Sequence, residues 1–73
     1  MTKEQREEVM NEFLACEDFY EEEREDEECV DDNTVHITRD HIRFCFSIPE
    51  ASDAEQEREM RRIAKDVDDI LNN

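Results

Sequence analysis

Apolar side chains near the start of the chain recur with the period of a helix. Four of them follow one another at spacings of four, three and four residues: Val9, Phe13, Cys16 and Tyr20. These spacings place them on one helical face. Thr2 and Gln5 match the capping box, in which two side chains satisfy the first free backbone N–H groups of a helix. We therefore predict a helix that begins at Thr2 and continues to about residue 23 to 27.

In the middle of the chain the period changes to two. Apolar and polar side chains alternate in two segments, 34–38 and 42–48, and Pro49 follows the second. Alternation predicts strands with one apolar face, and we expect Ile37 to pair with Ile42 in an antiparallel hairpin. Because the chain has no glycine, we expect a longer loop built on a type I turn instead of a two-residue primed turn.

A second helix is predicted from Ser52 to the end of the chain. Ser52 and Glu55 form another capping box. Six apolar side chains then follow at helical spacing with no interrupting charge: Met60, Ile63, Ala64, Val67, Ile70 and Leu71. Four bases share the opposite face: Arg58, Arg61, Arg62 and Lys65. The simplest interpretation is a solvated face of ion pairs, and the alternative is a docking surface for the acidic helix of a second copy.

The order helix, strand, strand, helix predicts one small α+β domain over residues 1–73. Both helices would pack on one face of the antiparallel β-hairpin, so that all the apolar stripes are buried together. A lone hairpin leaves two strand edges open. Either a homodimer pairs the second strand with its copy and completes a four-stranded sheet, or loops cover that edge. We favour the homodimer.

The most unusual segment is the acidic run of residues 17–32. It holds eleven Asp or Glu residues and a single base, Arg24. As a helix, sixteen residues would span ~24 Å, a length over which B-DNA carries ~14 phosphate charges. Solubility of a small domain needs a net charge of only ~2 to 8, whereas this chain carries −15. The excess predicts a binding surface for a positively charged partner.

The working part of this surface is predicted to be rigid from Glu17 to about Glu25, and residues 26–32 are predicted to form a flexible connector. On a helix, Phe19 would project among the acids as an aromatic anchor. In the alternative, the helix ends near Asp18 and Phe19 folds back into the core. The predicted partner-binding residues are Glu17, Asp18, Phe19, Glu21, Glu22, Glu25 and Asp26.

The net charge of −15 also excludes several partners. Direct binding to nucleic acid requires Lys and Arg to displace counterions, and an anionic membrane would repel this chain. No apolar stretch approaches the ~20 residues of a membrane span, and the charged N-terminus does not match a signal peptide. We expect a cytoplasmic protein whose three cysteines are reduced, since their number is odd and their spacing forms no disulfide framework.

No cofactor, metal site or catalytic site is predicted. His36, His41, Cys29 and Cys45 are residue types that bind zinc, but they lack the paired spacing of a zinc knuckle. A calcium loop of the EF-hand type requires a glycine. The chain has neither a nucleophile elbow nor a phosphate loop, and its core is too small to shelter a catalytic carboxylate pair. We therefore expect that it is not an enzyme.

Together these features predict an acidic inhibitor that occupies the basic, nucleic-acid-binding surface of another protein. In size and composition it is similar in kind to the small phage-encoded DNA mimics, including anti-restriction and anti-CRISPR proteins, which would place it in the cytoplasm of a host cell. The alternative is a small homodimeric regulatory module whose acidic helix docks a basic segment unrelated to nucleic acid. Adaptation to high salt, a third interpretation, would spread the acids over the whole surface.

Overall fold

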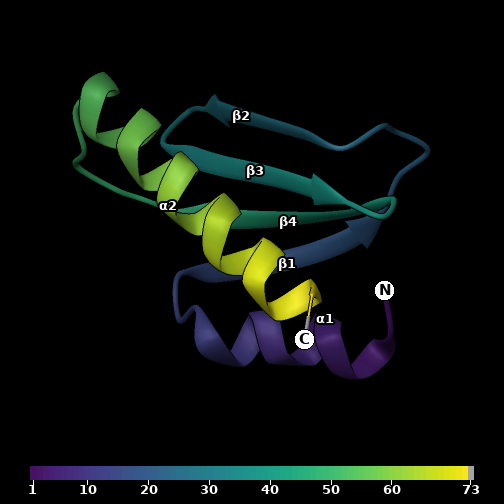
Figure 1. Ribbon diagram of the computed structural model, residues 1–73. Helices are drawn as coiled ribbons and strands as arrows, with labels where there is room; N and C mark the ends of the chain where they lie inside the picture. Colours follow the sequence, from purple (N-terminus) through teal and green to yellow (C-terminus); the bar gives the residue numbers. More distant parts are fainter. Residues whose placement is uncertain (73) are drawn as a thin grey trace.

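A computed structural model describes residues 1–72 and contains two helices and a four-stranded antiparallel sheet (Figure 1). The elements in chain order are α1 (Lys3–Glu12), β1 (Cys16–Glu21), β2 (Glu27–Asp31), β3 (Thr34–Arg39), β4 (Ile42–Ser47) and α2 (Asp53–Leu71). The predicted α+β class is confirmed. The predicted two-stranded arrangement is wrong, because the acidic run forms two further strands. One chain therefore builds the four-stranded sheet without a second copy.

Both helices begin at the predicted caps. Thr2 Oγ1 accepts the N–H of Gln5 at 3.1 Å, and the Gln5 side chain accepts the N–H of Thr2 at 2.8 Å. Ser52 Oγ accepts the N–H of Glu55 at 3.3 Å. However, α1 stops at Glu12 because Phe13 has an extended backbone (φ −108°, ψ 99°). The first helix is therefore much shorter than its predicted end at residue 23 to 27.

The predicted hairpin, β3 and β4, forms the centre of the sheet, whose strand order is β1-β4-β3-β2. Strands β2, β3 and β4 follow one another as hairpins, and β1 lies beside β4, which is a Greek key arrangement. Residues 22–26 cross from one edge to the other. They cover three strand spacings, about 14 Å, with a segment that reaches at most roughly 20 Å. The flexible connector predicted for residues 26–32 is thus wrong, since β2 occupies most of that range.

The turn between β3 and β4 contains only Asp40 and His41. Both have positive φ, 52° and 64°, as in a type I′ turn. The predicted longer loop is wrong because Asp and His enter this region more readily than most residues other than glycine. Ile37 consequently pairs with Phe44 instead of Ile42. A shift of two residues leaves the same side chains on the apolar face.

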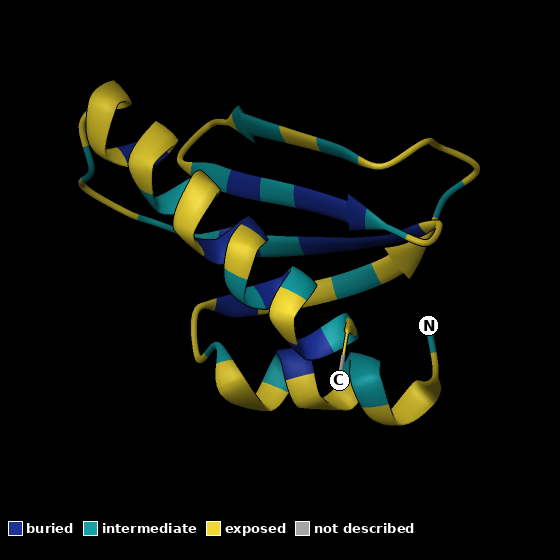
Figure 2. Ribbon diagram, viewed as in Figure 1, coloured by how far each residue is buried: buried dark blue, intermediate teal, exposed yellow. Residues whose placement is uncertain are grey.

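One hydrophobic core lies between the sheet and the helices (Figure 2). Its most deeply buried side chains come from both helices and both central strands: Val9, Val35, Ile37, Phe44, Phe46 and Val67. Helix α2 crosses the sheet and contacts β2 and β3, whereas α1 lies against β1 and α2 (Figure 1). The side chains that alternate with the core residues form the opposite, polar face of the sheet, which we call the open face.

Candidate functional site

The acidic run borders the sheet on three sides. Strands β1 and β2 are the two sheet edges, and residues 22–26 join them around one end (Figures 1 and 2). We call residues 17–32 the acidic frame. The frame is anchored at that end, because the N–H of Glu22 donates to His41 O at 2.8 Å and the N–H of Asp40 donates to the Asp26 carboxylate at 2.9 Å. The acids are therefore presented on a fixed backbone.

Strand β1 does not place Phe19 among the acids. A bulge between Cys16 and Asp18 turns both Cys16 and Phe19 toward the core. The Phe19 ring centre lies 6.1 Å from that of Phe44 and 5.8 Å from the guanidinium carbon of Arg6. The exposed aromatic anchor predicted for Phe19 is wrong, and the side chain packs against the core as in the alternative. Tyr20, predicted on the apolar stripe, is instead 41% exposed.

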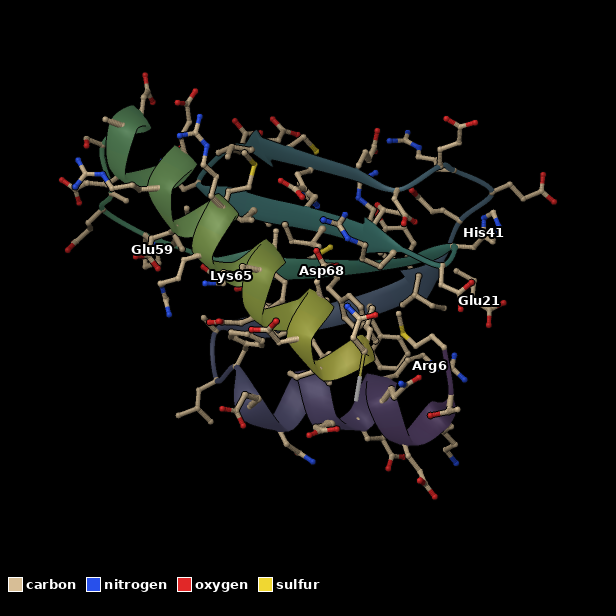
Figure 3. All side chains as sticks on the ribbon, viewed as in Figure 1. Arg6, Glu21, His41, Glu59, Lys65 and Asp68 are labelled. Carbon is tan, nitrogen blue, oxygen red and sulfur yellow. The ribbon has the colours of Figure 1, made fainter. Side chains whose placement is uncertain are left out.

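Four of the eleven acids form ion pairs with arginines. Glu21 lies 3.5 Å from Arg6, and both are labelled at the β1 edge in Figure 3. The other pairs join Glu22 to Arg43 (3.1 Å) and Arg24 (3.3 Å), Glu27 to Arg24 (2.8 Å) and Arg43 (3.8 Å), and Glu28 to Arg39. The hydrogen bond from Arg24 lowers the pKa of Glu27. The pairs to Arg39 and Arg43 bind the frame to the central strands, the pair to Arg6 binds it to α1, and the pairs to Arg24 lie within the frame.

The remaining seven acids of the frame are exposed and have no ion pair within residues 1–72: Glu17, Asp18, Glu23, Glu25, Asp26, Asp31 and Asp32. Strand register places four of them at one end of the sheet and the three from residues 22–26 at the other. Of the predicted binding residues, Glu17, Asp18, Glu25 and Asp26 are among the seven, whereas Glu21 and Glu22 are paired. Sequence reasoning omitted Glu23, Asp31 and Asp32.

Three of the four zinc-type residues, Cys29, His36 and Cys45, share the open face, whereas His41 lies in the turn between β3 and β4. Cys45 Sγ on β4 lies 3.4 Å from His36 Nδ1 on β3. Cys29 pairs with His36 from the other neighbouring strand, β2. Strands β2 and β4 are about 10 Å apart, too far for Cys29 and Cys45 to share a zinc ion or a disulfide. Burial raises the pKa of Cys45, and burial with the Arg43 charge lowers the pKa of His36. Within residues 1–72 no three ligating side chains are arranged around a metal position.

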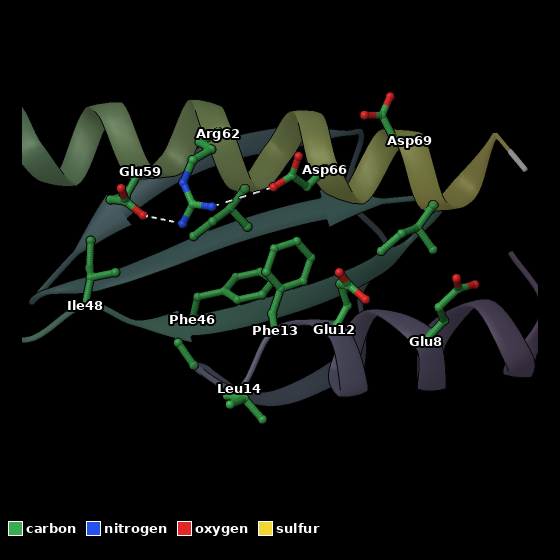
Figure 4. A pocket seen from close by; sticks show the side chains of 13 residues that line it. Glu8, Glu12, Phe13, Leu14, Phe46, Ile48, Glu59, Arg62, Asp66 and Asp69 are labelled. Carbon is green, nitrogen blue, oxygen red and sulfur yellow. Dashed lines mark hydrogen bonds and ion pairs between the residues drawn. The ribbon is translucent and has the colours of Figure 1, made fainter.

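A second surface feature is a groove of about 650 Å³ between α2 and the segment in which α1 ends (Figure 4). We call it the helix groove. Its floor is apolar: Phe13, Ala15, Phe46, Ile48, Ile63 and Ile70. Its rim carries Glu8, Glu12, Glu59, Asp66 and Asp69, with one base, Arg62. Leu14 lies at its edge and is 98% exposed. Sequence reasoning missed this groove because it depends on the early end of α1.

Comparisons with protein families, curated proteins and solved structures found no significant match to the chain. Neither helix within residues 1–72 combines the length and the apolar composition needed to cross a membrane.

Proposed function

We propose that this protein binds the basic, nucleic-acid-binding surface of another protein and thereby inhibits it. The observation that carries the proposal is the set of seven exposed acids of the frame that have no ion pair within residues 1–72. Strand β1, residues 22–26, strand β2 and the turn that follows β2 hold the backbone of these acids. A partner with a complementary pattern of Lys and Arg therefore meets acids whose backbone needs no further ordering.

Protection of the sheet edges explains only part of this acidity. Charged residues on edge strands prevent pairing with strands of other chains. Glu23, Glu25 and Asp26 lie outside the strands, where they have no edge to protect. Their mutual repulsion opposes the compact state. A basic partner surface would offset that repulsion and would be attracted at long range, which raises the association rate at low salt.

The proposal is tested by capture from a lysate of the source cells with tagged protein, at low and at high salt. We expect a nucleic-acid-binding protein to be captured at low salt, lost at high salt and displaced by added DNA. The triple substitution Glu17→Gln, Glu23→Gln and Glu25→Gln should weaken capture by about tenfold or more, since three charge contacts together amount to roughly 1.4 kcal/mol or more.

The matched control removes three exposed acids outside the frame: Glu50→Gln, Glu55→Gln and Glu57→Gln. It has the same net charge as the frame variant and should keep the wild-type capture. Equal losses in both variants would show that only total charge matters. A captured partner that ignores competitor DNA would exclude nucleic-acid mimicry.

One observation favours a second candidate function, a small regulatory module that docks a basic segment unrelated to nucleic acid. The helix groove has an apolar floor, which mimicry of a phosphate backbone does not require. In this candidate the module is a homodimer, and sedimentation velocity over a range of concentrations tests that state.

A further inference from the structure

We propose that the helix groove is a docking site for a basic peptide segment of a partner protein. One large apolar side chain of that segment would enter between α1 and α2, and flanking Lys or Arg side chains would meet the acidic rim. The inference concerns a different surface from the acidic frame and does not depend on mimicry of nucleic acid.

The apolar side chains of the groove are incompletely covered. Phe13 and Phe46 meet edge to face on its floor, with ring centres 5.3 Å apart. Phe46 is fully buried, whereas Phe13 and Ile48 stay half-buried. Leu14 is part of the lining but lies at its outer end, where its side chain points away from Phe13 and Phe46 and is free to contact a bound segment (Figure 4). Apolar patches bordered by polar residues mark interaction sites, and a volume of about 650 Å³ is typical of binding pockets.

The charges of the rim decide which kind of segment fits. Glu8 and Glu12 are exposed and have no ion pair within the described chain, and Figure 4 shows their carboxylates on the side of α1 that faces α2. The one base of the lining, Arg62, is engaged by Glu59 at 2.6 Å and by Asp66 at 3.7 Å. Glu59 and Asp66 are the partners of Arg62, so the free charge that faces the groove is that of Glu8 and Glu12, while the Asp69 carboxylate points away from α1 (Figure 4). An acidic segment would be repelled, whereas a basic one finds complementary charge.

The position of Glu12 gives an independent argument. It occupies the last position of α1, and the last turn of that helix contains no base. Negative charge at a helix C-terminus is unfavourable because the backbone dipole already places partial negative charge there. Asp69 in α2 stands in the same situation, since the last turn of α2 also lacks a base. Both acids oppose local stability, and Glu12, whose carboxylate lies on the side of α1 that faces α2, is the one placed to meet a ligand in the groove (Figure 4).

The test is a selection of random twelve-residue peptides, displayed on phage, against the whole 73-residue protein. We expect the enriched peptides to combine two or more Lys or Arg residues with a Leu, Ile, Phe or Trp. Their affinity should fall about tenfold for Leu14→Gln, the loss expected when one leucine contact is removed. It should fall at least as much for the double substitution Glu8→Gln and Glu12→Gln. The control pair Glu50→Gln and Glu57→Gln has the same net charge and should bind like the wild type.

Glu12→Lys separates binding from folding. It removes the unfavourable charge at the end of α1, so its melting temperature should equal or exceed that of the wild type while peptide binding is lost. Binding by basic peptides that lack an apolar residue, or that ignore both groove variants, would overturn the docking proposal and leave the function of the acidic frame open.

Two other outcomes would also overturn the docking proposal. One is the absence of any enrichment over the Glu12→Lys variant. The other is a concentration-dependent dimer that Leu14→Gln dissociates, because a second copy would then be the occupant of the groove. Neither outcome depends on residues of the acidic frame, so the proposed inhibition of a nucleic-acid-binding protein would still stand or fall by its own experiment.

Discussion

The central and the edge strands of this sheet differ in what holds them in place. Strands β3 and β4 bury their alternate side chains, among them Val35, Ile37, Phe44 and Phe46. Strand β2 turns only Val30 and Glu28 toward the helix side, and most other edge residues are acids. The central hairpin is thus formed by its own apolar face. The edge strands depend on backbone pairing with that hairpin and on its arginines.

The central strands therefore supply most of the stability, whereas the edge strands carry most of the exposed charge. Arg39 and Arg43 belong to the central strands, yet their guanidinium groups bond to Glu22, Glu27 and Glu28 of the frame. The centre therefore neutralises the acids nearest to it. The more distant acids keep their charge, and the frame can hold many like charges because the centre supplies the burial that its own sequence lacks.

The largest expected effect comes from truncating a central aromatic residue. Phe44 is fully buried and packs against Phe19 and Phe46. Phe44→Ala should cost about 3–5 kcal/mol, a large part of the total of roughly 4–11 kcal/mol expected for a chain of this length. Phe19→Ala on the edge should cost about 1–2 kcal/mol, because its ring is only half-buried. Urea unfolding followed by circular dichroism measures both values.

Phe44→Ala will not fold if the wild type lies at the lower end of that range. The pair Phe44→Leu and Phe19→Leu keeps the comparison measurable, with the larger loss expected at Phe44. Equal losses at the two positions would mean that β1 contributes to the core as much as β4 does, and the distinction between centre and edge would fail.

The sequence predicts those elements in which the spacing of apolar residues matches the face that the fold buries. The strands around Ile37 and Phe44 alternate because one face is buried, and α2 has one uninterrupted apolar stripe. Both caps follow from side chains next to their own helix. In each of these cases the interactions that form the element lie within it or beside it in the chain.

The strand β1 could not be predicted in this way, because its bulge hides its period. Cys16 and Phe19 both face the core although they are three residues apart. The helical spacing of Val9, Phe13, Cys16 and Tyr20 predicts a helix instead, although Tyr20 lies on the open face beside Arg43. The open edge that suggested a homodimer was occupied by β1 of the same chain. The helix groove was equally hidden, since it forms where α1 stops and Leu14 becomes exposed.

A second prediction concerns the arginines that connect centre and frame. The Arg43 side chain is 10% exposed and bonds Glu22, whereas Arg24 is 53% exposed. Arg43→Met should destabilise the protein by about 2 kcal/mol, since it leaves a partly buried carboxylate with fewer partners. Arg24→Met should cost less than about 1 kcal/mol, as surface ion pairs do. Thermal unfolding at low salt measures the difference.

Added salt sharpens this comparison. Screening weakens exposed ion pairs much more than buried ones. The effect of Arg24→Met should therefore nearly vanish in 1 M NaCl, while most of the Arg43→Met effect persists. If both effects vanished together, Arg43 would belong to the surface charge of the frame and would not anchor it to the centre.

The smallest expected effect concerns the turn of the central hairpin, where a residue other than glycine adopts a strained backbone conformation. His41 has φ 64° and an exposed side chain, and a left-handed conformation costs roughly 1–2 kcal/mol in residues other than glycine. His41→Gly relieves that strain but gains freedom in the unfolded chain, so we expect a net stabilisation of about 0.5 kcal/mol. His41→Val should lose about 1 kcal/mol, because a branched Cβ fits this region poorly, and His41→Asn serves as the neutral control.

A strained two-residue turn would be supported if the urea midpoint is highest for the glycine variant, intermediate and equal for the asparagine variant and the wild type, and lowest for the valine variant. A valine variant as stable as the wild type would show that the turn is relaxed and that the longer loop predicted from the sequence describes the hairpin better.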